Sequence, residues 1–159
     1  MDLLERLLGH DHWATARLLD FSTALSDVKL DQPFDVGHGT LRATFEHMIF
    51  NVESWTALMA EHSVDGRPDH CSVAELIDRH ERSSATFATL AVRVRDEQRL
   101  DDTFVDHFGE RMTFGGAIIH VVLHNAEHRS EALHILERLD VPDLPELDHG
   151  LWDLTMRGT

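Results

Sequence analysis

Residues 118–129 read IIHVVLHNAEHR, and this stretch decides the fold. At about 100° per residue, its apolar side chains and those that follow fall on one broad arc, which predicts a long amphipathic helix over about residues 117–139. His120, His124 and His128 recur every four residues, and the last two lie at one edge of the apolar arc. A helix of this kind is typical of a helical bundle, where side chains of facing helices often build metal sites.

Apolar residues recur at three- and four-residue steps in three further stretches, about residues 3–25, 40–62 and 72–98. Thr40 is placed as an N-cap of the second, and Ser72 with Glu75 forms a capping box before the third. Alternation around Gly109 within 100–114 predicts a short hairpin, and apolar residues of 144–156 predict a packed tail with a short helix. The sequence therefore predicts an all-α four-helix bundle in a single domain, 1–159, with a short hairpin before the fourth helix.

The chain is strongly acidic, with 14 Lys and Arg against 29 Asp and Glu among 159 residues and a net charge of -15. Nucleic acids and anionic membranes bind through clustered Lys and Arg, so neither is an expected partner. No apolar run reaches the roughly 18 residues of a membrane span, and the N-terminus does not read as a signal peptide. A single cysteine, Cys71, cannot form an internal disulfide, which fits a cytoplasmic location.

Two of the histidines of the 117–139 helix are predicted metal ligands. Residues four apart lie one above the other, so His124 and His128 can reach one ion. His120 and His124 have the same spacing, but the core edge favours the pair His124 and His128. His120 and His128 lie about 12 Å apart along the axis, too far to share a metal. Asn125 follows the first histidine of the pair where the zincin motif has its glutamate base, so this is not that motif.

The second predicted helix supplies a third ligand, because His47 borders its apolar stripe. Three neutral imidazoles with an open position are typical of a catalytic metal site. Asp11 lies within the apolar stripe of the first helix, where it would be a fourth ligand, a carboxylate that orients a ligand imidazole, or a solvated residue. The histidines at loops and helix ends are expected to be solvated: His38, His62, His70, His107 and His149.

Four segments resemble the DinB-like (DNA-damage-inducible) family of four-helix metalloenzymes, which includes bacillithiol- and mycothiol-dependent transferases. The matching segments are 10–14 (HDHWA), 40–55 with His47, 120–129 (HVVLHNAEHR) and 144–148 (LPELD). In that family one histidine of the second helix and two of the fourth hold the metal, and these fall on His47, His124 and His128. Ser130-Glu131 stands where the family usually has Gly-Gln, and Asp11 where it more often has Asn.

The resemblance implies a divalent-metal-dependent enzyme that acts on a small molecule, with Zn²⁺ or Ni²⁺ as the ion. Transfer of a low-molecular-weight thiol to a small electrophile is the favoured reaction, and metal-dependent hydrolysis is the alternative. Asp11 and His120 are candidates for orienting the ligands. A third reading is a non-catalytic, stress-related metal-binding bundle whose site is closed by a fourth ligand, Asp11 or His120. Arg42 or Arg129 is a candidate for holding an anionic substrate group.

A homodimer is expected, because members of the family often pair through a face of the bundle. Apolar residues of the first helix also lie on more than one of its sides: Leu3, Leu8, Trp13 and Leu19.

Overall fold

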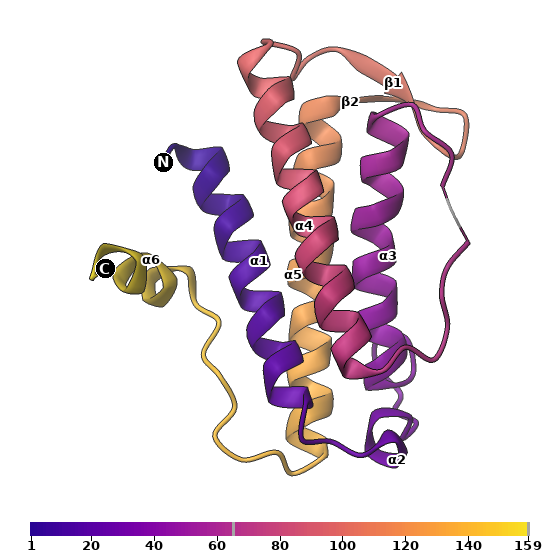
Figure 1. Cartoon of the computed structure of the whole chain (residues 1–159), viewed down its shortest axis with the longest axis vertical. Helices are drawn as coiled ribbons and strands as arrows, with labels where there is room; N and C mark the ends of the chain where they lie inside the picture. Colours follow the sequence, from indigo (N-terminus) through magenta and orange to yellow (C-terminus); the bar gives the residue numbers. More distant parts are fainter. Residues whose placement is uncertain (65, 159) are drawn as a thin grey trace.

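The computed structural model describes residues 1–64 and 66–158, and four long helices dominate it (Figure 1). They are α1 (Leu3–Ser22), α3 (Leu41–Met59), α4 (Val73–Asp96) and α5 (Phe114–Arg138). The shorter elements are α2 (Asp27–Leu30), β1 (Thr103–Val105), β2 (Arg111–Thr113) and α6 (His149–Arg157). The all-α bundle with a short hairpin before its fourth long helix is confirmed.

Side-chain caps fix where the long helices begin. Thr40 caps α3 by accepting from the Ala43 backbone N–H at 3.1 Å, and Ser72 and Glu75 form the expected capping box of α4. Helix α5 begins at Phe114, three residues earlier than the sequence pattern indicates, because Thr113 caps it and accepts from the Gly116 N–H at 3.0 Å. A Cβ at Gly116 would lie 2.8 Å from that hydroxyl oxygen, so the cap requires a glycine there.

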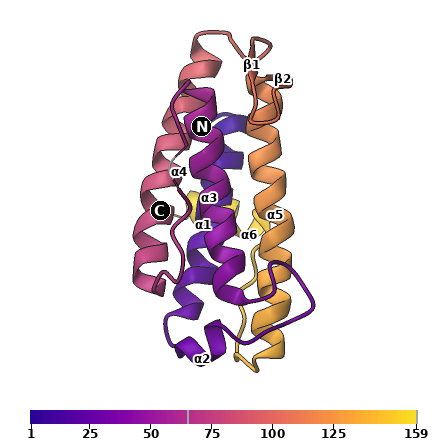
Figure 2. The same ribbon diagram turned by 90° about the vertical axis from the view of Figure 1, so that its right-hand side faces the viewer.

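Each long helix packs against two others, in the cyclic order α1, α4, α3, α5 (Figures 1 and 2). Two clusters of buried apolar side chains fill the bundle, one near the end that carries α2 and one near the hairpin. Phe45 and Leu136 are fully buried in the first, and Val121 in the second. Helices α3 and α5 are therefore direct neighbours, held in register by this packing.

The hairpin and the C-terminal segment cover the bundle's edges. Strands β1 and β2 pair antiparallel with Phe104 opposite Met112, and the buried Phe104 ring packs on Phe114 at 5.1 Å between centroids. Helix α6 packs beside α1 through Trp152, where a Cβ at Gly9 would lie only 2.8 Å from the indole ring. The packed tail that the sequence predicts is thus present.

None of the helices in the described part of the chain combines the length and the apolar character needed to cross a membrane.

Candidate metal centre

Helices α3 and α5 bring three imidazoles together in their shared interface. The Nε2 atom of His124 lies 3.1 Å from Nε2 of His47 and 3.3 Å from Nε2 of His128. These are the three residues that the sequence predicts as ligands. In a tetrahedral zinc site with Zn–N bonds of about 2.0–2.1 Å, two ligand nitrogens lie about 3.3 Å apart. The two distances from His124 match this spacing, whereas the histidines whose ligand atoms all lie within 4.8 Å of one another are His38, His47 and His128.

Two of these imidazoles, His47 and His124, have lowered pKa values and are neutral at ordinary pH. Burial first, and then the neighbouring histidines His38, His128 and His124, because each opposes a second positive charge, together lower the pKa of His47 to about 3. Burial likewise lowers the pKa of His124 to about 4, with His128 and His120 adding to the effect. A neutral imidazole keeps the lone pair that a metal needs, so the site is prepared for a cation.

Glu131 orients one of the predicted ligands, a role that the sequence reasoning did not assign. Its Oε2 lies 2.5 Å from Nδ1 of His128, one helical turn away on α5. A carboxylate at Nδ1 keeps the proton on that nitrogen and leaves Nε2 free to bind a metal. The signal was in the sequence, because a carboxylate three residues after a helical histidine lies on the same face.

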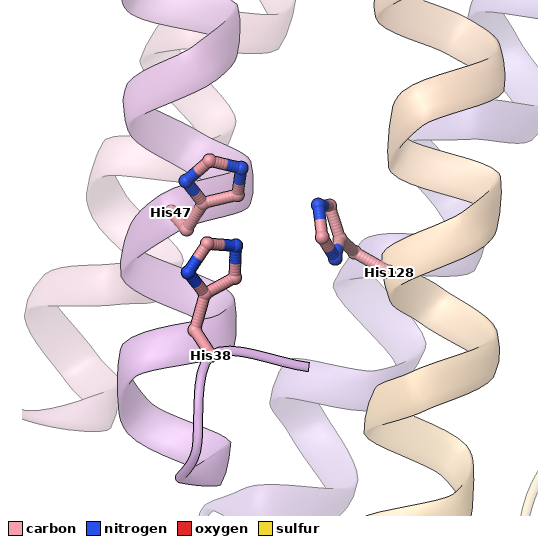
Figure 3. Close-up of side chains that lie close together, drawn as sticks. All are labelled: His38, His47 and His128. Atoms are coloured by element: carbon pink, nitrogen blue, oxygen red, sulfur yellow. The ribbon is translucent and has the colours of Figure 1, made fainter. Parts of the chain in front are cut away.

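His38 also belongs to the cluster, although the sequence predicted a solvated loop histidine. Its ring stacks on that of His47, with centroids 3.7 Å apart, and its centroid lies 5.0 Å from that of His128. The potential ligand atoms of His38, His47 and His128 all lie within 4.8 Å of one another (Figure 3). Periodicity places residues only within a helix, and His38 precedes α3, so no helical pattern could have located it.

Asp11 has partners that the sequence did not suggest. It is buried, and its carboxylate pairs with Arg129 and accepts from Asn125 Nδ2 at 3.0 Å. Burial rules out the expected solvated residue, and the contacts of the carboxylate are with Asn125 and Arg129, each next to a predicted ligand in the chain. The reason lies in α5: Asn125 and Arg129 each follow a predicted ligand, so they point about 100° away from it, toward α1.

The two arginines that were candidates for holding an anionic substrate group are both hydrogen-bonded to other parts of the bundle. Arg129 is buried against Asp11 and Thr15 of α1. Arg42 is buried as well and donates to Asp27 at 2.6 Å and to the Cys71 carbonyl at 2.5 Å. Both therefore support the packing of the bundle rather than line the histidine cluster.

His120 lies one turn from the cluster, toward the hairpin. Its ring centroid is 5.5 Å from that of His124 and 5.0 Å from that of Trp55, which it meets edge-on. His107 contacts the same indole at 5.7 Å. His120 therefore adjoins His124 on one side and the indole ring of Trp55 on the other.

Two facing helices of the bundle thus supply converging imidazoles, an arrangement that is compatible with a metal-binding bundle protein. The sequence model of the DinB family matches residues 1–144, and the chain belongs to that family.

Among solved structures, the fold is similar to the crystal structure of a DinB-like protein from Bacillus cereus ATCC 10987. The TM-score is 0.68 at 18% sequence identity, covering 87% of this chain and 91% of the other. At that identity the likeness shows the shared fold alone. A search of curated proteins returned no match for this sequence.

Proposed function

We propose that the protein is a divalent-metal-dependent enzyme that transfers a low-molecular-weight thiol to a small electrophile. The observation that carries the proposal is the convergence of the Nε2 atoms of His47, His124 and His128 at 3.1 and 3.3 Å. Family membership and the resemblance to bacillithiol- and mycothiol-dependent transferases support the choice of chemistry.

The three imidazoles would hold the ion through Nε2 without adding negative charge. When bound, the ion supplies an uncompensated positive charge that stabilises a thiolate or a hydroxide at neutral pH. Glu131 keeps His128 in the tautomer that ligates. Zn²⁺ and Ni²⁺ both suit imidazole ligands, and the metal-loaded protein is best tested with each.

Thiol transfer is favoured over hydrolysis because Glu131, the one carboxylate seen in contact with the cluster among the described residues, is already hydrogen-bonded to a predicted ligand. Water bound to the ion would lose its proton as a thiol does, but departure of the leaving group in hydrolysis is helped by an acid that protonates it, and Glu131 already accepts from His128. Displacement of a good leaving group by a thiolate needs no such acid. The thiolate sulfur attacks the electrophilic carbon, the leaving group departs with the bonding electron pair, and the thiol proton passes to solvent.

The experiment loads the purified protein with Zn²⁺ or Ni²⁺ and offers bacillithiol, mycothiol, glutathione or cysteine with chlorodinitrobenzene. We expect metal-dependent formation of the thioether with at least one thiol. The absorbance of the thioether product measures its formation. His128→Ala should abolish it, while His134→Ala, which removes an exposed histidine of the same helix, should leave it unchanged.

Two other outcomes would replace the proposal. Metal-dependent cleavage of nitrophenyl esters without any thiol transfer would favour the hydrolase alternative. Metal binding with neither activity would favour a non-catalytic bundle with a closed site.

A further inference from the structure

The loop between α2 and α3 is shaped to carry His38. Both neighbours of His38 are glycines with positive φ, 58° at Gly37 and 85° at Gly39, a backbone region that other residues rarely adopt. The Phe34 N–H donates to the Gly39 carbonyl at 2.7 Å, and the His38 N–H donates to Thr44 Oγ1 at 3.3 Å. The loop is therefore closed on itself and tied to the first turns of α3.

The same loop lies directly against the residue that orients His128. A Cβ at Gly37 would lie 3.0 Å from Glu131 Oε2 and 3.0 Å from Thr44 Oγ1. Such contacts are tighter than most Cβ contacts in proteins, and the positive φ of 58° also disfavours other residues, so a glycine suits this close approach to α5. This approach places the next residue, His38, over the histidine cluster.

The imidazole of His38 differs from the other three in how it is held. It stacks on His47 at 3.7 Å with the planes 26° apart, and its ligand atoms lie within 4.8 Å of those of His47 and His128 (Figure 3). His47, His124 and His128 project from two packed helices and are half-buried, whereas His38 is exposed. A metal held by the three helical residues would thus have a fourth imidazole within reach from the solvent side.

We propose that His38 is a fourth, exchangeable ligand that closes the metal site until an incoming thiolate displaces it. The inference rests on the proposed metal centre. Four protein ligands are typical of a structural zinc site and three of a catalytic one. An exposed ligand on a loop can leave without unfolding a helix, so one site has a closed and an open state. Apparent thiol affinity is then reduced by the fraction of protein in the closed state.

The test uses Co²⁺ alone as the metal probe and its visible absorption as the readout, with no assay of activity. In the unaltered protein, four nitrogen donors should give the intense bands of tetrahedral Co²⁺. In His38→Ala, solvent should take the fourth position, the bands should weaken, and millimolar imidazole should restore them. The unaltered protein and His134→Ala, the matched control on α5, should not respond to imidazole.

A thiol titration tests the displacement. β-Mercaptoethanol should produce a sulfur-to-cobalt charge-transfer band in all three proteins. Half-saturation of His38→Ala should need about tenfold less thiol than the unaltered protein, because no protein ligand competes. Gly37→Ala, which pushes the loop away from Glu131 while keeping His38, should shift the titration in the same direction. Far-ultraviolet circular dichroism checks that each variant is folded.

The outcomes separate this inference from the proposed function. If the unaltered protein binds no Co²⁺, the metal centre itself is lost. If Co²⁺ binds but His38→Ala has the spectrum, imidazole response and thiol titration of the unaltered protein, His38 is not a ligand. If His38→Ala changes the spectrum but thiol never enters the unaltered protein, His38 is a permanent ligand and the exchange is overturned.

Discussion

His47, His124 and His128 have equal standing at the candidate metal centre, because the proposed fourth ligand, His38, has its own position and cannot replace a lost one. Changing any one to alanine should weaken Zn²⁺ binding by at least about a hundredfold, since the binding energy of a zinc site is shared among few ligands. His120→Ala should retain the metal, because its ring adjoins Trp55 and lies one turn from the converging nitrogens. Competition with a chromophoric chelator measures each affinity.

The opposite result for the alanine variants of α5 would assign a different pair of ligands. If His120→Ala lost the ion while His128→Ala kept it, the pair on α5 would be His120 and His124, displaced by one turn. The contact of 3.3 Å between Nε2 of His124 and Nε2 of His128 would then have no role in binding.

Glu131 should matter to the metal without touching it. Glu131→Gln keeps the size of the side chain but weakens its hold on the Nδ1 proton of His128, so Zn²⁺ affinity should fall about tenfold to a hundredfold. Glu137→Gln, near the exposed His134 on the same helix, is the matched control and should have no effect. Isothermal titration with Zn²⁺ measures both. Equal affinities of the two variants would show that Glu131 does not orient His128.

Regular elements could be predicted from the sequence far better than their connections. The positions of α1, α3, α4 and α5 follow from three- and four-residue apolar steps, and the same periodicity placed His124 and His128 on one face. His38 and α2 could not be predicted, because the segment between α1 and α3 has no period that fixes which way a side chain points. The partner of Asp11 could not be predicted for a related reason: Arg129 lies 118 positions away in the chain.

The ion pair between Asp11 and Arg129 should stabilise the packing of α1 on α5. In Asp11→Ala the buried guanidinium loses its partner, and an uncompensated buried charge costs about 3–5 kcal/mol. Asp35→Ala breaks the exposed pair between Asp35 and Arg138 instead and should cost far less, because solvent screens that pair. Urea denaturation of the metal-free proteins gives both free energies of unfolding. Equal small losses would mean that the buried pair adds nothing to this interface.

The whole molecule is expected to be a homodimer, although some of the apolar residues of α1 that suggested a dimer are buried within the chain's own core. Leu8 and Leu19 belong to the bundle's own core, whereas Leu3 is 74% exposed. Ile119 and Leu123, one turn apart on α5, are also exposed. Sedimentation velocity at micromolar concentration should show twice the chain mass of 18.1 kDa. A species of the single-chain mass at every concentration would rule the dimer out.

The neutral histidines should make the metal-free protein sensitive to mild acid. The pKa values of His47 and His124 are lowered to about 3 and about 4, and burial also lowers the pKa of His80. The unfolded chain takes up protons near the ordinary value of about 6.5, whereas the folded chain does not. Since the unfolded state then binds more protons, stability is complete above about pH 6.5 and is lost as the pH falls toward 4.

Each such histidine contributes a slope of at most about 1.4 kcal/mol per pH unit, and less where solvent screens a half-buried ring. Unfolding by urea in the presence of a chelator, at pH 7.5, 6.0 and 5.0, measures this loss above the range where carboxylates such as Asp35 titrate. The double variant His47→Gln with His124→Gln should lose less stability over the same interval, because two of the groups that resist protonation are gone. A double variant with an unchanged pH dependence would locate the acid sensitivity elsewhere, at groups such as His80 between α1 and α4.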